Sequence, residues 1–370
     1  MNQKIKFSIY GLVFWFLLFL AWEWYFSYPK VSLPPISFPK SKEQKIDSIL
    51  VESLTRYLIP GVALGVVEDG KITYLKSFGY QNLAKKDCLR ITTPVPVASI
   101  SKLFTALATA EYFGDQGLPI TTPISELINA ELEFPEDYKS LTLNQLLSHT
   151  SGIRDISLLG KIGDWTSSSL LRKLPSRLSS ISQKKGAYHY ADTNFDLLGF
   201  LLMQHSQVDF DQLLTQMTLK KAGMNQAFWI QSTEIPSDSI QGYQRTFPWR
   251  RIKKEKFSLP LSPSPSAGLA VSAEDLSKFL LHLSRGKMSD FYPEIEWLQT
   301  KSGIPAGFQS IVIHGKPYLG HFGEQGGFSS VLLISLDWET GIFVLSNAAD
   351  HADHRKKISS EVLQLIHTPS

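Results

Sequence analysis

The segments patterned as β-strand lie at the two ends of this chain, and a long helical stretch separates them. Residues 59–82, "IPGVALGVVEDGKITYLKSFGYQN", place two apolar runs around an Asp-Gly pair, which predicts a β-hairpin. Three further strands are expected at residues 307–323 (broken by a turn at 315–316), 328–336 and 341–347. Because residues 99–230 read as mainly helical, we predict an α+β fold. Its antiparallel sheet is built from both chain ends and flanked by helices, with an inserted, mainly helical region.

The first residues of the chain predict a membrane anchor. Lys4 and Lys6 precede sixteen uncharged residues, 7–22, and apolar character resumes after Glu23 as far as residue 28. A bilayer requires about 20 apolar residues, and the aromatic cluster at residues 22–28 is typical of a membrane interface. A cleaved signal peptide is the alternative, but the segment offers no A-x-A-like cleavage site. We expect a single-pass helix in the cytoplasmic membrane, with the rest of the chain on the outer (periplasmic or extracellular) side.

Three parts of the chain follow from this interpretation. Residues 1–28 form the anchor, and residues 29–42, with four prolines, form an extended linker. Residues 43–368 form one globular domain, which opens with an amphipathic helix at 43–58 and ends with a helix at 355–366.

Composition excludes several classes of function. The net charge of +3 is too small to indicate a nucleic-acid partner. The chain has a single cysteine, Cys88, and no zinc-like Cys/His array, P-loop or G-x-G-x-x-G motif. We therefore expect no metal and no cofactor.

The first candidate catalytic motif is Ser99-x-x-Lys102, in "VASISKLFTA". Residues three apart share a helix face, so the lysine amine can lie beside the serine oxygen and accept its proton. The bare pattern also occurs at Ser27, Ser37, Ser182 and Ser284, but only Ser99 lies at the N-terminus of a strongly patterned helix. Taken alone, the motif fits two interpretations equally well: a catalytic serine and lysine, or a serine that caps the helix and is followed by a surface lysine.

Two further motifs support a catalytic interpretation. Tyr190-Ala191-Asp192 stands just before another helix, and a tyrosine beside a lysine can have its pKa lowered and act as general acid or base. His321-Phe322-Gly323 ends a predicted strand, where glycine lets a substrate lie along the strand edge. Lys301-Ser302-Gly303 is a competing motif, but the Ile-Pro-Ala-Gly that follows suits a loop better.

Together these motifs resemble the serine β-lactamase and penicillin-binding-protein superfamily, especially its class C β-lactamase-like branch of esterases, D-aminopeptidases and D-alanyl-D-alanine carboxypeptidases. The resemblance also covers "LNQLLSHTSGI" at 143–153 and "SAGLAVSAEDLSKFL" at 266–280. It implies a β-lactamase-like fold in which Ser99 is the acylated nucleophile, Lys102 its activating base and Tyr190 a proton relay. It also implies an oxyanion hole formed by the backbone N–H groups of Ser99 and Glu324. For His149, within the first of these segments, we expect a structural role.

Three departures from the family pattern affect the substrate-binding residues Asp192, His321, Gly323 and Glu324. Asp192 replaces the usual asparagine and so lacks an amide donor. Phe322 replaces a small hydroxyl residue, and His321 stands where lysine is frequent, so we expect no fixed positive charge for a substrate carboxylate. We therefore predict a membrane-anchored serine hydrolase that cleaves an ester, amide or peptide, with a cell-wall peptide as a candidate substrate. A β-lactamase, or a non-catalytic cell-wall peptide-binding protein of the same fold, is the alternative.

A basic, aromatic stretch stands apart from these motifs. Residues 250–256 contain five cations, beside Phe247 and Trp249. Such a stretch fits a solvated loop, or a surface that contacts anionic lipid or an acidic wall polymer close to the membrane.

Overall fold

The computed structural model describes residues 3–128, 134–156, 169–232, 239–259 and 264–368. The helices are α1 Gln3–Tyr25, α2 Lys42–Tyr57, α3 Ser101–Asp115, α4 Glu136–Lys139, α5 Leu143–Leu147, α6 Ser169–Arg172, α7 Asp192–Ser206, α8 Phe210–Leu214, α9 Ala273–Leu283, α10 Tyr292–Trp297 and α11 His354–His367. The strands are β1 Gly61–Glu68, β2 Lys71–Asn82, β3 Asp87–Cys88, β4 Val95–Pro96, β5 Phe228–Trp229, β6 Tyr243–Arg245, β7 Ile252–Lys254, β8 Leu269–Val271, β9 Gln309–Ile313, β10 Lys316–Gln325, β11 Phe328–Ser335 and β12 Thr340–Ser346.

The main sheet joins the two ends of the chain. Its seven strands run in the order β3-β2-β1-β12-β11-β10-β9, and all neighbours are antiparallel. The predicted hairpin is β1–β2, which turns at Asp69 and Gly70 with φ angles of 50° and 68°. The positive φ angles explain the Asp-Gly pair, because these residues tolerate the left-handed region. The predicted fold class and the break between β9 and β10 are confirmed.

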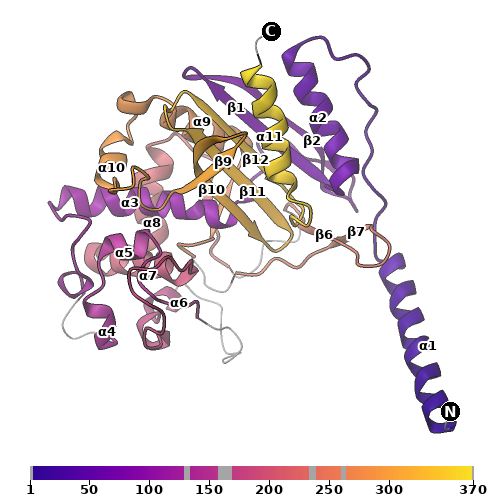
Figure 1. Ribbon diagram of the computed structural model, residues 1–370, viewed down its shortest axis with the longest axis horizontal. Coiled ribbons are helices and arrows are strands. Elements are labelled where there is room, and N and C mark those ends of the chain that lie inside the picture. The colour runs from indigo at the N-terminus through magenta and orange to yellow at the C-terminus, as the bar shows by residue number, and fades with distance from the viewer. Residues whose placement is uncertain (1–2, 129–133, 157–168, 233–238, 260–263, 369–370) are drawn as a thin grey trace.

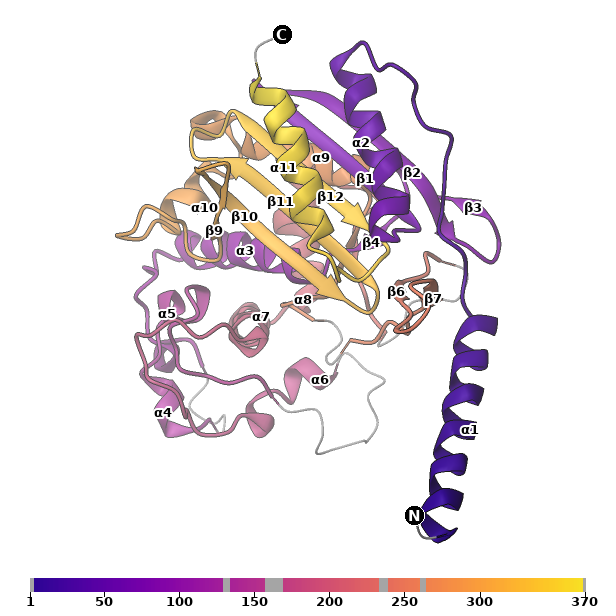
Figure 2. The ribbon, with the colours of Figure 1, turned by 45° about the vertical axis from the view of Figure 1, so that its right-hand side comes forward.

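Helices cover both faces of the sheet, as Figures 1 and 2 show. On one face α2 and α11 pack on the sheet through a core that includes Leu50, Leu54 and Val362. On the other face α9 packs on β1, β2 and β12, and a second core extends from there to α3 and α7. The helices α3 to α8 form the predicted inserted region, below the sheet in Figure 2. Strand β10 runs past the turn that precedes α3, and this junction positions the candidate site.

The N-terminal helix α1 projects away from this body (Figure 1). Residues Ser8–Tyr25 are long and apolar enough to cross a membrane, and only 6% of that window is buried. The linker after it is extended, as predicted, but it is not a free tether. Val31 is buried in the core beside α2, and its carbonyl accepts a hydrogen bond from the Thr55 hydroxyl at 2.9 Å.

Candidate active site

Ser99 lies in a 3-10 turn, Ala98–Ile100, that leads into α3. The sequence analysis placed Ser99 at the start of the helix itself, but regular α-helix begins two residues later, at Ser101. Ala98 has a φ of 48°, a left-handed conformation that a non-glycine residue holds only where contacts fix it. The Ser101 hydroxyl supplies such contacts, since it donates to the Ala98 carbonyl at 2.6 Å and accepts from the Leu269 N–H at 3.0 Å. The turn therefore presents Ser99 from a firmly held backbone.

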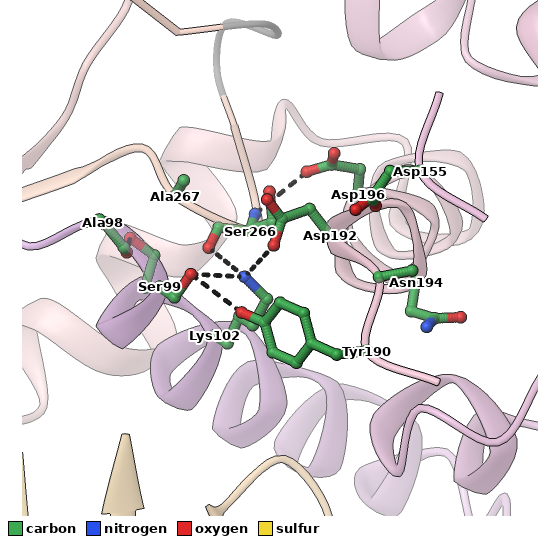
Figure 3. A network of polar contacts seen from close by, with 12 residues as sticks. Ala98, Ser99, Lys102, Asp155, Tyr190, Asp192, Asn194, Asp196, Ser266 and Ala267 are labelled. Carbon is green, nitrogen blue, oxygen red and sulfur yellow. Dashed lines mark hydrogen bonds and ion pairs between the residues drawn. The ribbon is translucent and has the colours of Figure 1, made fainter. Parts of the chain in front are cut away.

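Lys102 is fully buried beneath Ser99 (Figure 3). Its Nζ donates to Ser99 Oγ at 3.0 Å, to Asp192 Oδ1 at 2.7 Å and to the Ser266 carbonyl at 2.9 Å. Burial alone lowers the pKa of Lys102, but the negative charge of Asp192, together with Tyr190, outweighs burial and raises that pKa above its ordinary value. Lys102 is thus protonated at neutral pH when no substrate is bound.

Tyr190 is the second side chain that contacts the nucleophile. Its hydroxyl donates to Ser99 Oγ at 3.0 Å, and its ring stacks on His149 with centroids 4.4 Å apart. Lys102 acts to lower the pKa of Tyr190, as expected, but the net shift of this pKa is upward. Burial raises this pKa, and the charge of Asp192 adds to the effect, so that both outweigh the opposing charge of Lys102. The resting side chain is therefore a neutral phenol that can donate a proton.

His149 holds the segment that carries Tyr190. Its Nδ1 accepts a hydrogen bond from the Ala191 N–H at 3.3 Å and lies 3.1 Å from the Asn194 amide nitrogen. Burial, reinforced by the charge of Lys102, lowers the pKa of His149 to about 4. A neutral, hydrogen-bonded ring under Tyr190 fits the structural role that we expected for this residue.

A second carboxyl group, which the sequence analysis missed, supports the lysine from below. Asp196 is fully enclosed on α7, one turn after Asp192, and its Oδ1 accepts the Ser266 N–H at 3.1 Å (Figure 3). Burial raises the pKa of Asp196 to about 7, and the charge of Asp192 contributes to the rise. Since the Ser266 carbonyl binds Lys102, Asp196 positions the lysine through the backbone of Ser266. The helical spacing from Asp192 is the signal that could have identified it.

Strand β10 places Gly323 directly against the nucleophile. A Cβ atom at this position would lie 2.1 Å from the Val97 carbonyl oxygen and 3.1 Å from the Ser99 backbone nitrogen. Only glycine fits this approach, which brings strand β10 against the Ser99 backbone. The Glu324 side chain turns away to Arg355, with an ion pair at 3.1 Å, so this residue can serve substrate only through its backbone.

His321 is buried on β10 with its ring centroid 6.1 Å from that of Tyr190. Burial, together with the charge of Lys102, lowers the pKa of His321 to about 3. The ring is therefore neutral, and its Nδ1 lies 2.6 Å from the Phe322 carbonyl oxygen. As the sequence analysis expected, His321 offers no positive charge to a substrate.

A fixed cation nevertheless reaches the strand, which the sequence analysis did not anticipate. Arg355, on α11, donates to the Gly323 carbonyl, and its guanidinium lies 5.1 Å from the centroid of the Phe322 ring. It forms ion pairs with Glu324 and with buried Asp350, whose Oδ2 is 2.7 Å away. Because two carboxylates already balance Arg355, the site still presents little net positive charge to a carboxylate.

A cavity of about 610 Å³ opens beside His321 and Phe322. It extends from the edge strand β9 to the segments 147–149 and 300–308, and its lining is largely apolar or uncharged, with Lys356 at its rim. The competing motif, Lys301-Ser302-Gly303, lies in a turn as expected, and Ser302 lines this cavity rather than contacting Ser99. In the part of the chain that the structure describes, no three His, Cys, Asp or Glu residues gather in a way that could hold a metal.

The geometry is that of a serine hydrolase: a hydroxyl that two proton-carrying side chains contact, beside a glycine that leaves room for backbone donors. The beta-lactamase family model matches residues 46–365. The chain therefore belongs to the beta-lactamase family.

The chain is also similar to curated proteins and to a solved structure. Protein flp of Staphylococcus aureus (strain MW2) is 26% identical over 331 residues, which cover 82% of this chain and 63% of that protein. A D-aminopeptidase of Cereibacter sphaeroides is 24% identical over 308 residues, covering 79% and 58%. The chain thus spans less than two thirds of the length of these relatives. The structure of D-amino acid amidase from Ochrobactrum anthropi SV3 matches with a TM-score of 0.75 at 18% identity, covering 89% of this chain and 100% of that one, which establishes likeness of fold.

Proposed function

We propose that the protein is a membrane-anchored serine hydrolase that cleaves an ester, amide or short peptide bond through an acyl-enzyme on Ser99, with a cell-wall peptide as the substrate class. The observation that carries the proposal is the pair of hydrogen bonds that Ser99 Oγ receives from Lys102 and Tyr190, each at 3.0 Å. Capping a helix does not require that a buried lysine and a tyrosine both donate hydrogen bonds to the serine oxygen.

The geometry supports a two-step acyl transfer. Lys102 acts as the base in the fraction of molecules that have lost its ammonium proton to solvent, and this fraction grows toward alkaline pH because the pKa of Lys102 is raised. In these molecules Ser99 Oγ attacks the substrate carbonyl carbon, and Lys102 takes the hydroxyl proton. The oxygen that becomes negative accepts hydrogen bonds from the N–H groups of Ser99 and Glu324. Tyr190 gives its phenolic proton to the leaving nitrogen or oxygen as the bond to carbon breaks, and recovers a proton from Lys102. A water molecule then attacks the acyl-enzyme by the reverse proton path and frees Ser99.

The polar groups around Ser99 favour amide and ester substrates over β-lactams. Neutral His321 and the balanced Arg355 offer little attraction to the carboxylate of a penicillin. Asp192, with a partly exposed side chain beside Lys102, presents an acceptor where asparagine would present a donor. A substrate N–H or ammonium group suits that acceptor, and a D-aminopeptidase is among the relatives.

The anchor proposal rests on α1. At 1.5 Å per residue its 23 residues extend about 34 Å, against a hydrocarbon thickness of about 30 Å. Large apolar side chains along it are exposed, including Leu12, Trp15 and Leu17. Lys4 and Lys6 at its start place the N-terminus on the cytoplasmic side and the hydrolase domain outside. Sequencing of the mature N-terminus tests this arrangement, because a cleaved signal peptide would remove residues up to or beyond position 20.

Labelling with a fluorophosphonate and a fluorescent penicillin tests the catalytic proposal. We expect one label per chain, at Ser99, with the fluorophosphonate reacting faster than the penicillin. Ser99→Ala should abolish labelling, whereas Ser302→Ala, a matched change in the competing motif, should leave it unchanged. Labelling that persists in Ser99→Ala, or that disappears in Ser302→Ala alone, would contradict the assignment of the nucleophile.

A further inference from the structure

The basic stretch at residues 250–256 belongs largely to a hairpin, β6–β7, that contacts the end of α1. Trp249 Nε1 donates to the Leu20 carbonyl at 3.1 Å, and its ring meets Trp24 edge-on with centroids 5.4 Å apart. Arg251 lies over the Trp24 ring at 4.2 Å and donates to the hydroxyl of Ser27 at 2.7 Å. The hairpin therefore contacts both faces of the last helical turn and the residues that follow it.

An ion pair and a strand-like bridge complete the contact. Glu23, which is only 2% exposed, pairs with Lys253 at 2.8 Å. Tyr28 and Ile252 exchange two backbone hydrogen bonds, at 2.6 and 3.1 Å. Glu23 is the acidic residue that interrupts the apolar segment, and the pairing with Lys253 explains why the interruption is tolerated at this point.

The base of the same hairpin is fixed to the main sheet. Tyr243 is fully buried, and its N–H approaches the carbonyls of Gly327 and Asn347 at 3.1 and 3.0 Å. Its carbonyl accepts the Ala349 N–H at 2.8 Å. Gly327 belongs to the turn between β10 and β11, just after the oxyanion strand segment. The hairpin thus joins α1 to the catalytic sheet, and in both ribbon views it lies between them (Figures 1 and 2).

The exposed side chains of the hairpin have the composition of a membrane-interface element. Phe247 is 89% exposed and Trp249 is 42% exposed in the turn. Arg250 is exposed in the same turn, and Lys254 and Lys256 are exposed at the base of the hairpin and just after it. Since Trp249 contacts Leu20 and Lys253 pairs with Glu23, the hairpin lies at the level where the apolar helix ends, which is where aromatic rings and cations meet lipid headgroups.

We propose that the β6–β7 hairpin rests on an anionic lipid leaflet, with Phe247 and Trp249 at the interface and Arg250, Lys254 and Lys256 among the headgroups. The hairpin thereby holds the hydrolase domain at a fixed orientation on the membrane surface. This inference rests on the proposed anchoring by α1. It favours lipid over wall polymer because Trp249 contacts the anchor, and a soluble polyanion gives the exposed Phe247 no apolar partner.

A site-specific fluorescent label in the full chain tests the proposal. Cys88, the single cysteine, is replaced by serine, and an NBD label is attached through Phe247→Cys in one protein and through Met288→Cys in a second. Met288 is a matched control because it is 84% exposed and lies in the segment that joins α9 to α10. Figure 1 shows α10 on the opposite side of the body from α1. Both proteins are reconstituted in phosphatidylcholine vesicles, with or without about 30% phosphatidylglycerol, which supplies the anionic surface charge.

Quenching by a nitroxide lipid near the headgroups is the readout. We expect strong quenching at position 247 in the anionic vesicles, weaker quenching in neutral vesicles or high salt, and none at position 288. Replacing Arg250, Lys254 and Lys256 together by glutamine should shift the equilibrium away from lipid contact by about a hundredfold, at about fivefold per cation.

Four results would overturn the proposal. One is an unquenched label at position 247 in chains that float with the vesicles, which leaves the anchor intact. A second is equal quenching at positions 247 and 288. A third is a triple glutamine variant that loses binding to a soluble acidic polymer but keeps its lipid quenching. The last is a chain that fails to float with the vesicles, because this result contradicts both the proposed anchor and the proposed lipid contact. Ester hydrolysis by the same sample then tests the catalytic site separately.

Discussion

Replacing Gly323 by alanine is the smallest change that should disable catalysis without removing a chemical group. The added Cβ would lie 2.1 Å from the Val97 carbonyl oxygen, 2.5 Å from Ser330 Oγ and 3.1 Å from the Ser99 backbone nitrogen. Ser330 cannot simply rotate away, because its hydroxyl donates to that same Val97 carbonyl at 2.8 Å. The strand and the nucleophile turn must therefore separate.

The size of the effect follows from that separation. Cβ contacts shorter than 3.0 Å essentially do not occur, so the gap to Val97 must open by about 0.9 Å. A misplacement of about 1 Å costs on the order of 10²-fold in rate, and losing one oxyanion donor costs about 10² to 10³. We expect kcat/KM for a p-nitrophenyl ester to fall about 10²-fold, with a loss of roughly 1–3 kcal/mol in the free energy of unfolding.

Two control substitutions separate geometry from stability. Gly114→Ala, within α3 itself, meets only the Trp297 side chain, at 3.3 Å at the nearest, and should keep full activity. Gly65→Ala overlaps Phe343 at 2.3 Å inside the sheet, so it should destabilise the fold while folded molecules remain active. A folded Gly323→Ala enzyme with wild-type kcat/KM would refute the oxyanion assignment.

Three further predictions concern the buried charges. Lys102→Ala should slow fluorophosphonate labelling by at least about 10²-fold; a labelling rate within a few fold of wild type would exclude the lysine as base. Because Asp192 raises the pKa values of both Lys102 and Tyr190, wild-type kcat/KM should rise toward alkaline pH, and Asp192→Asn should move that rise to lower pH; an unmoved profile would contradict the coupling. The folded-state pKa of Asp196 is raised to about 7, so its stabilising proton is held at low pH and lost as the pH rises. In denaturation curves, the free energy of unfolding of the wild type should therefore fall by up to roughly 4 kcal/mol relative to that of Asp196→Asn between about pH 4 and pH 7. A difference between the two free energies of unfolding that does not change with pH would count against a buried, titrating carboxyl.

The main sheet could be predicted because its strands carry local signals. The Asp69-Gly70 turn marks the hairpin, and β11 and β12 are short apolar runs with clear ends. The strands β4 to β8 are only two or three residues long, so they leave no periodicity to detect. Packing of the linker could not be foreseen either, because its proline content indicates extended chain but not what the chain lies against.

The sequence identified those site residues that lie in a local sequence motif. It missed the residues that reach the site only through tertiary contacts. Ser99, Lys102 and Tyr190 converge as the motifs predicted. Arg355 reaches Gly323 from a helix 32 residues further along the chain, and no local pattern marks that contact. The direction of the Tyr190 pKa was wrong because burial, which dominates it, is a property of the folded chain.

The pairing of β1 with β12 has a consequence for biogenesis. These strands stand at opposite ends of the polypeptide, so the hairpin β1–β2 keeps an open edge until the last strand has been synthesised and exported. Ser99 and Lys102 are synthesised early, but the Gly323 strand joins them only when the sheet closes. In the outward-facing arrangement that we propose, the enzyme therefore stays inactive during translocation and becomes active when its C-terminal strands reach the far side of the membrane.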